Sequence, residues 1–167
     1  MKRPYLLILL ISTLAIFMIG VILNKNVSTS NGLVNLPKLN LLNIDGKIVD
    51  NDLFNIKQPK IFVFFSTDCS ACNDEIDLLY ENRQLFKEVQ ISFISGDPLD
   101  TIRKFIPNGI DSVLVLHDIN NGFSQKMGIK GFPSIFIFDK NNILTKKLTG
   151  AVPMHDILDN IPHEKKN

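Results

Sequence analysis

The chain has few residues with which to bind a metal ion, and it has almost no excess of positive charge with which to attract a polyanion. Its 167 residues include two cysteines and three histidines, and its formal net charge is +1. A structural zinc site normally needs four ligands, and His117, His155 and His163 are scattered without ligand spacing. A net charge so close to zero gives no reason to expect a nucleic acid as partner. We therefore expect neither a metal site nor a nucleic-acid-binding function.

Charge is also missing from the stretch between Tyr5 and Leu23, which is predominantly apolar. At about 1.5 Å per residue, a helix of this length nearly matches a bilayer core of about 30 Å, so a transmembrane anchor is predicted. Lys2 and Arg3 precede the stretch. The positive-inside tendency then places residues 1–4 in the cytoplasm and the rest of the chain outside, in a single-pass protein of the cell membrane.

A cleaved signal peptide is the alternative for this segment. The apolar core of a signal peptide is usually about 7–15 residues long, and this run is longer. Ser28-Thr29-Ser30 would be a poor cleavage site, and the sequence has no Ala-x-Ala site and no lipobox cysteine. We favour an uncleaved anchor, and in either case the folded part of the chain is exported.

The remaining residues divide into a linker and a domain. Residues 24–35 are polar and rich in Asn and Ser, as in flexible linkers, and 36–163 are expected to fold. Asp45-Gly46 predicts a β-hairpin over 39–49 with a type I′ turn, and the unbroken apolar run 61–65 predicts a central strand. Further strands are predicted over 91–95, 112–116, 134–138 and 143–148, and helices over 70–86, 98–105, 121–127 and 153–161. This order predicts an α/β sandwich with a mixed sheet.

The two cysteines stand at the predicted junction between a strand and a helix. Cys69 and Cys72 follow the run 61–65 and are three residues apart, so both sulfurs lie on one helix face and can form a disulfide. Three residues near the helix start are candidates for its N-cap: Thr67, Asp68 and Ser70. Unpaired N–H groups at a helix N-terminus would favour a Cys69 thiolate. The spacing indicates a redox pair; a structural disulfide and half of a metal site are the alternatives.

Several motifs together resemble those of the TlpA/ResA-like branch of the thioredoxin superfamily. They are the Asp-Gly-Lys of the hairpin, the segment FVFFSTDCSAC, the later segment MGIKGFPSIFIFDKNN and the Gly150 region. The resemblance covers residues 36–162. It implies a thioredoxin-like α/β sandwich with a mixed central sheet and an added N-terminal β-hairpin.

The resemblance also implies roles for three residues besides the cysteines. Pro133 would follow a cis peptide bond and face the cysteine pair. Phe132, before it, would offer backbone groups to an extended substrate segment. Glu75, three residues after Cys72, would be an acid that tunes thiol protonation; the alternative is an ordinary helix carboxylate that faces water.

Some positions depart from the family pattern. Asp68 stands where most relatives have Trp before the first cysteine, and Val63 stands where cytosolic thioredoxins have a buried Asp. Ser70-Ala71 differs from the usual Pro-containing dipeptides. These departures make a general thioredoxin role less favoured, and the redox potential is not transferable from relatives.

The combined pattern predicts a membrane-anchored, extracytoplasmic thiol–disulfide oxidoreductase. Cys69 would attack a substrate disulfide and Cys72 would resolve the mixed disulfide. Because the cysteine pair carries the electrons, no cofactor is expected, and an integral-membrane dithiol partner would have to renew them. By resemblance, the partners would be exported protein thiols or disulfides, for example apocytochrome c in cytochrome c maturation. Negative charge from Asp68 and Glu75 would disfavour the thiolate, so we expect a reductant.

Three other functions stay open. A disulfide-forming oxidant would use the same pair in the opposite direction. A thiol peroxidase usually has a Pro-x-x-x-Thr/Ser-x-x-Cys loop; Ser66 fits the hydroxyl position, but Phe62 occupies the proline position. A thioredoxin-fold accessory protein, similar to a metallochaperone, would bind a client or a copper-site precursor through Cys69 and Cys72 without turnover.

Overall fold

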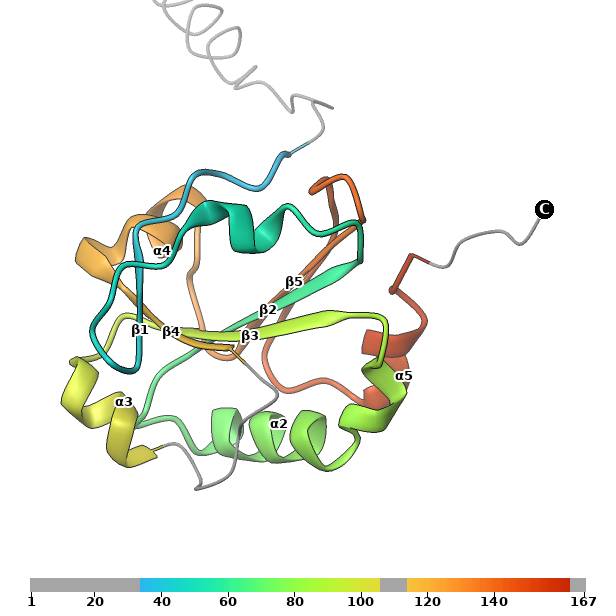
Figure 1. The fold of residues 1–167 in the computed structure, drawn as a ribbon. Helices are drawn as coiled ribbons and strands as arrows, with labels where there is room; N and C mark the ends of the chain where they lie inside the picture. The colour runs from blue at the N-terminus through green and yellow to red at the C-terminus, as the bar shows by residue number, and fades with distance from the viewer. Residues whose placement is uncertain (1–33, 106–113, 163–167) are drawn as a thin grey trace, which may run out of the picture. The chain divides into compact units, whose positions relative to one another are not determined.

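The computed structural model describes residues 34–105 and 114–162, and in this part of the chain six strands form one sheet (Figure 1). The strand order is β1-β4-β3-β2-β5-β6. The strands are β1 Leu41–Asn43, β2 Lys60–Phe65, β3 Gln90–Ser95, β4 Leu114–Asp118, β5 Ser134–Phe138 and β6 Leu144–Thr149. β2, β3 and β4 run parallel, while β1 is antiparallel to β4, β5 to β2 and β6 to β5. The predicted α/β sandwich with a mixed sheet is confirmed.

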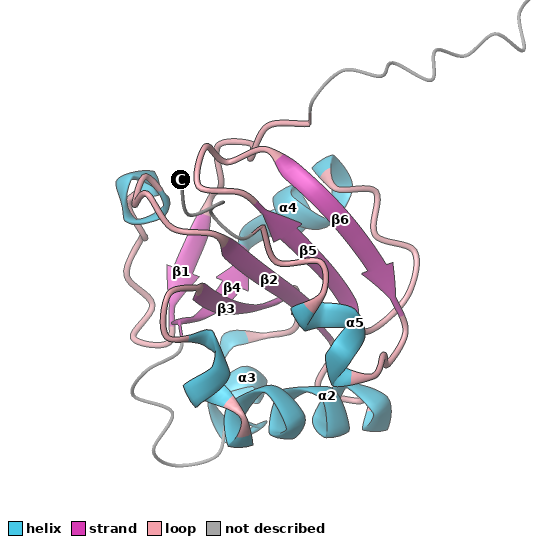
Figure 2. Cartoon of the chain, turned by 90° about the vertical axis from the view of Figure 1, so that its right-hand side faces the viewer, coloured by secondary structure: helices cyan, strands magenta, loops and turns pink. Residues whose placement is uncertain are grey.

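Apolar side chains cover both faces of the sheet. β2 is buried along its whole length, because Val63 and Phe65 point to one face and Phe62 and Phe64 to the other. The helices are α2 Ser70–Glu81, α3 Leu99–Phe105, α4 Gly122–Lys126 and α5 Met154–Leu158. α2, α3 and α5 pack on the first face and α4 on the second, and Figure 2 shows α2 and α3 together below the sheet. Burial on both faces explains why the central strand is continuously apolar.

α2 begins where predicted but ends earlier, at Glu81 instead of near residue 86. The Asn82 side chain donates to Leu78 O at 2.8 Å and closes the last turn. Three short 3-10 helices are also present in the described residues: η1 Asn51–Phe54, η2 Arg83–Phe86 and η3 Ile119–Asn121. Phe86, the last residue of η2, is buried in the core. The observed bounds of the other strands and helices after residue 60 differ from the predicted bounds by at most three residues.

The predicted N-terminal hairpin is only partly present. β1 pairs with β4, and the returning segment contributes an isolated bridge between Leu42 and Ile48. The type I′ turn is wrong, because Gly46 has a φ of +82° whereas Asp45 has no positive φ. The Asn43 side chain directs the turn instead, since its Oδ1 atom accepts from Asp45 N at 3.1 Å. Ile48 is 82% exposed, so no buried face fixes a longer pairing.

No helix among the described residues is long and apolar enough to cross a membrane. The predicted cytoplasmic tip, the anchor and nearly all of the linker, residues 1–33, lie outside the described residues. Val34 and Asn35, the last two residues of the predicted linker, run beside the start of β6. Leu144 N donates to Val34 O at 2.8 Å, and Asn35 bridges to Ile143.

Candidate active site

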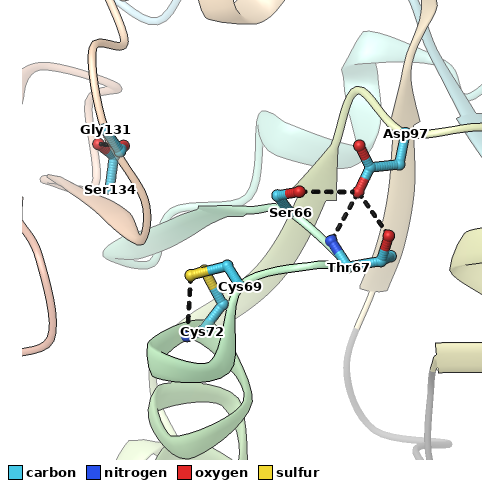
Figure 3. Close-up of a disulfide and its surroundings, with 7 residues drawn as sticks. All are labelled: Ser66, Thr67, Cys69, Cys72, Asp97, Gly131 and Ser134. Atoms are coloured by element: carbon cyan, nitrogen blue, oxygen red, sulfur yellow. Dashed lines mark hydrogen bonds between the residues drawn. A yellow bond between two sulfur atoms is a disulfide. The ribbon is translucent and has the colours of Figure 1, made fainter.

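Cys69 and Cys72 lie where β2 passes into α2. They are joined by a disulfide, with their Cα atoms 5.3 Å apart (Figure 3). Cys69 is itself the N-cap of α2, and its sulfur accepts a hydrogen bond from Cys72 N at 3.2 Å. The prediction that Thr67, Asp68 or Ser70 caps the helix is therefore wrong; the Thr67 side chain bonds to Asp97 instead. The Cys69 sulfur lies at the helix N-terminus, where backbone N–H groups favour negative charge.

The two sulfur-bearing residues differ in exposure. Cys72 is fully buried and packs in the core with Ile76 and Leu79 of α2, whereas Cys69 is partly exposed. A substrate can reach Cys69 before it can reach Cys72. This difference favours Cys69 as the attacking thiol and Cys72 as the resolving thiol, and both roles stay predictions.

The loop between β2 and the cysteines is held by Asp97, which follows β3. Its Oδ2 atom accepts hydrogen bonds from Thr67 N at 2.6 Å, Thr67 Oγ1 at 2.8 Å and Ser66 Oγ at 3.2 Å (Figure 3). Burial would raise the pKa of Asp97, but these hydrogen bonds outweigh it and hold the pKa below its ordinary value. The Asp97 carboxylate is therefore ionised at neutral pH.

Sequence reasoning did not identify Asp97, although the pattern contained a signal for it. The strands over 61–65 and 91–95 were both predicted, with a helix between them that makes a parallel pair the expected arrangement. Parallel strands end at the same edge of a sheet. An acidic residue directly after the second strand therefore lies near the loop that follows the first.

The Phe132–Pro133 peptide bond is cis, as the resemblance implied. β5 begins at the next residue, and Ser134 pairs with Phe64 of β2. The cis bond therefore lies beside the end of β2 from which the cysteine loop departs. Figure 3 shows Ser134 and Gly131, on either side of this bond, across from the two sulfur atoms.

The Phe132 side chain and backbone are both open to solvent or to a substrate. The side chain is 46% exposed, and its ring stacks on Phe64 with centroids 5.8 Å apart. Phe64 in turn stacks on Phe123 of α4 at 5.9 Å, so the exposed ring is supported from the core. No described residue hydrogen-bonds to the Phe132 amide or carbonyl. These groups are free to pair with an extended segment, and this role stays a prediction.

Glu75 lies one turn after Cys72 on α2 and is only 2% exposed. The alternative of a helix carboxylate that faces water is therefore wrong. Its Oε2 atom accepts from Val152 N at 3.1 Å, whereas its buried Oε1 atom has no hydrogen-bond partner among the described residues. Desolvation raises the pKa of Glu75, and the hydrogen bond from Val152 offsets only part of that rise. A buried acid with a raised pKa near a buried thiol is suited to proton exchange.

Within residues 34–105 and 114–162, no group of His, Cys, Asp and Glu side chains is arranged to hold a metal ion. His117 lies in β4 and His155 in α5, while His163 is outside the described residues. The two sulfurs and the buried acid Glu75 are the reactive groups that the structure places in this region.

These features make the protein a thiol–disulfide oxidoreductase of the thioredoxin fold, with one sulfur open to a substrate and the other buried behind it. The chain belongs to the AhpC/TSA family, whose model matches residues 34–147. Among curated proteins, none matches the chain.

Several solved structures share this fold. An uncharacterized thioredoxin-like protein from Porphyromonas gingivalis is 29% identical, with a TM-score of 0.59, and the match covers 76% of this chain and 88% of that one. StoA from Bacillus subtilis is 15% identical, with a TM-score of 0.60 and coverage of 76% and 98%. A secreted Mycobacterium tuberculosis disulfide oxidoreductase homologous to E. coli DsbE is 14% identical, with a TM-score of 0.61 and coverage of 71% and 90%. The last two likenesses concern the fold alone.

Proposed function

We propose that the protein is a membrane-anchored, extracytoplasmic reductant of disulfides in exported proteins. The observation that carries the direction of electron flow is the acidic surroundings of the pair: Asp68 precedes Cys69, Glu75 lies one turn after Cys72, and Asp97 holds the loop. No cationic side chain in the described residues hydrogen-bonds to either sulfur. A thiolate with acidic neighbours is weakly stabilised, so the reduced pair gives up its electrons readily.

The proposed reaction begins with the reduced pair. The Cys69 thiolate attacks a client disulfide, the client S–S bond breaks, and one client sulfur leaves as a thiolate. The Cys72 thiol then loses its proton and attacks the Cys69 sulfur of the mixed disulfide. This second step releases the other client sulfur and forms the Cys69–Cys72 disulfide present in the structure. Two electrons have passed from the cysteine pair to the client, which takes up two protons.

Glu75 is the proposed acceptor of the Cys72 proton. Cys72 is fully buried, so water has poor access to its thiol when the mixed disulfide must be resolved. Glu75 lies on the same side of α2, one turn away, and its unpaired Oε1 atom is able to accept a proton without breaking the bond from Val152. The raised pKa of Glu75 brings it closer to that of a thiol, which makes the transfer easier.

Client binding is proposed at the Phe132–Pro133 segment. The free amide and carbonyl of Phe132 would pair with an extended client backbone, which brings the client disulfide to Cys69. The exposed ring of Phe132 would contact an apolar client side chain. A binding mode based on backbone groups suits an enzyme with several clients, such as apocytochrome c or another exported protein.

The location and the electron source also belong to the proposal. Residues 5–23 would anchor the protein in the membrane with the catalytic domain outside, and an integral-membrane dithiol protein would reduce the pair again after each turnover.

Reduction of insulin by the full-length protein in detergent micelles, with dithiothreitol as electron donor, tests the activity. We expect precipitation of the reduced insulin chains to be accelerated by the wild type and not by Cys69→Ser. No acceleration by the wild type, together with stable binding of a client through the cysteines, would favour the accessory-protein alternative.

The peroxidase alternative is tested by consumption of hydrogen peroxide. In peroxidases the hydroxyl and proline positions lie in a loop, whereas here Phe62 is fully buried within β2 and pairs with Ser92 and Phe136. We therefore expect any consumption of hydrogen peroxide by the protein to be slower than its reduction of insulin. Rapid peroxide turnover that depends on Cys69 would replace the proposed function.

A further inference from the structure

Asp97 joins two loops at the edge of the sheet where the cysteines lie. Besides the three hydrogen bonds that its carboxylate accepts from Ser66 and Thr67, its own amide donates to Ser95 Oγ at 3.1 Å. Ser95 is the last residue of β3 and is fully buried. The carboxylate therefore stands on a fixed part of the sheet and holds the more exposed loop that follows β2.

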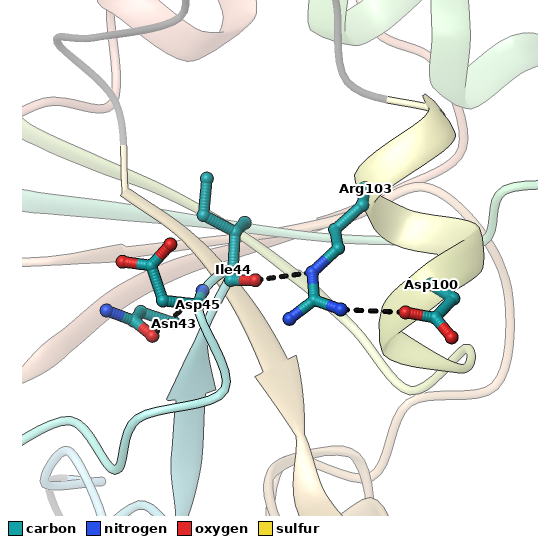
Figure 4. A network of polar contacts seen from close by, with 5 residues as sticks. All are labelled: Asn43, Ile44, Asp45, Asp100 and Arg103. Atoms are coloured by element: carbon teal, nitrogen blue, oxygen red, sulfur yellow. Dashed lines mark hydrogen bonds and ion pairs between the residues drawn. The ribbon is translucent and has the colours of Figure 1, made fainter.

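The segment that follows Asp97 is also anchored. α3 begins at Leu99, and its Arg103 donates from Nε to Ile44 O at 2.6 Å in the turn after β1 (Figure 4). The same guanidinium contacts Asp100 through Nη1 at 2.7 Å. Asp97 is thus held on one side by β3 and on the other by a helix tied to the β1 turn. Because Asp97 is fixed on both sides, it can hold the loop that follows β2 in a defined position.

The loop held by Asp97 includes the attacking cysteine. Cys69 N donates to Ser66 O at 3.2 Å, so residues 66–69 form one turn whose first two residues are bonded to Asp97. Figure 3 shows Asp97 on the opposite side of this turn from the sulfur atoms. Asp97 therefore acts on the backbone that carries Cys69 and not on the reacting atoms.

We propose that Asp97 is a positioning residue for thiol–disulfide exchange: it holds the turn 66–69 so that Cys69 meets a polypeptide disulfide bound along Phe132 and Pro133. Misplacing a reacting group by about 1 Å can lower a rate by about 100-fold. The inference rests on the proposed client site at Phe132 and Pro133. Because it concerns the attack by Cys69 itself, it does not depend on whether the protein is a reductant or an oxidant in the cell.

Two reactions of Cys69 distinguish positioning from mere folding. Alkylation by iodoacetamide needs an accessible thiolate, whereas attack on insulin also needs alignment with a bound polypeptide. Both are measured on full-length reduced protein in detergent, in a Cys72→Ser background, so that the insulin reaction stops at the mixed disulfide. The quantity compared is the ratio of the insulin rate constant to the iodoacetamide rate constant, which is independent of the midpoint potential.

Asp97→Ala should lower this ratio by about 10-fold or more, because all three loop hydrogen bonds are lost. Asp97→Asn keeps the shape and an accepting oxygen, and should restore most of the ratio. Asp100→Asn is the matched control: it removes a carboxylate from the next helix, while Arg103 keeps its hydrogen bond to Ile44 O and the turn 66–69 is untouched. It should leave the ratio unchanged.

An unchanged ratio in Asp97→Ala would overturn the proposal, whether both rate constants stay the same or both fall equally. An equal fall would indicate a general loss of structure. If Asp97→Ala does not fold, the double change Ser66→Ala with Thr67→Val tests the same contact from the other side, because it removes two of the three donors. Its ratio should also fall, and a ratio equal to that of the background protein would contradict the proposal. If the wild type shows no reductase turnover but Asp97→Ala still lowers the ratio, the result would count against the proposed function alone.

Discussion

Replacement of Glu75 by Gln should stabilise the protein at neutral pH, although it removes an ionisable group from the candidate site. Glu75 is 2% exposed; its Oε2 atom accepts from Val152 N at 3.1 Å, and its Oε1 atom has no partner among the described residues. Gln keeps the shape of the side chain and an oxygen that accepts the same hydrogen bond. The main change is that position 75 no longer ionises in a desolvated environment.

The pH dependence of this effect has a definite sign. Burial raises the pKa of Glu75 in the folded protein, so the unfolded chain loses this proton first as the pH rises. Between the unfolded and the folded pKa, the wild type loses up to about 1.4 kcal/mol of unfolding free energy per pH unit relative to Glu75→Gln. Below the ordinary carboxyl pKa both proteins are neutral at this position, and no such difference is expected. Above the folded pKa the difference is constant.

Urea unfolding of the full-length oxidised protein in detergent measures this difference. The chain has no tryptophan, so far-UV circular dichroism is the suitable probe. Glu81→Gln is the matched control, because Glu81 ends the same helix and is exposed. The advantage of Glu75→Gln should grow from about pH 4 upward, while Glu81→Gln should follow the wild type. A Glu75→Gln protein that becomes progressively less stable than the wild type as the pH rises would refute the reasoning.

Three further predictions concern the cysteines, the client site and the membrane segment. Iodoacetamide at mildly acidic pH should label Cys69 before Cys72, and Cys72→Ser should accumulate mixed disulfides with clients; faster labelling of Cys72 would reverse the assigned roles. Phe132→Ala should raise the KM for insulin by up to about 10-fold through loss of an exposed aromatic contact, with little change in the iodoacetamide rate of Cys69; an unchanged KM would remove Phe132 from the client site. The protein should fractionate with membranes, and a reporter fused after Asn167 should be active only outside the cytoplasm; a soluble form that begins near Asn31 would instead indicate a cleaved signal peptide.

The order of strands and helices was predictable because it depends on local patterns. Each of three elements is predicted by its own residues, without reference to the rest of the chain: the strand at the apolar run 61–65, the helix after Ser70 and the strand at 134–138. The turn after β1 was not predictable in the same way. Asp45-Gly46 favours a type I′ turn, but the Asn43 side chain bonds to the amide of Asp45 and directs a different one.

The cysteines and the cis-proline of the site were predictable from the sequence, but the contacts of the residues around them were not. Val152, which bonds to Glu75, is 77 residues away in the sequence, so the burial of this acid depends on how the β6–α5 loop packs on α2. Asp97 is 30 residues from Thr67 and meets it only because β2 and β3 are adjacent and parallel. Such contacts follow from topology, and spacing within one element carries no information about them.

The reduction potential of the Cys69–Cys72 pair tests the central claim most directly. The full-length protein in detergent is equilibrated with mixtures of reduced and oxidised glutathione, and the fraction of reduced pair is measured by alkylation. Acidic neighbours and a weakly stabilised thiolate predict a potential near the thioredoxin end of the range, about −270 mV. A potential near the DsbA end, about −120 mV, together with efficient oxidation of reduced peptides, would contradict the account and indicate a disulfide-forming enzyme.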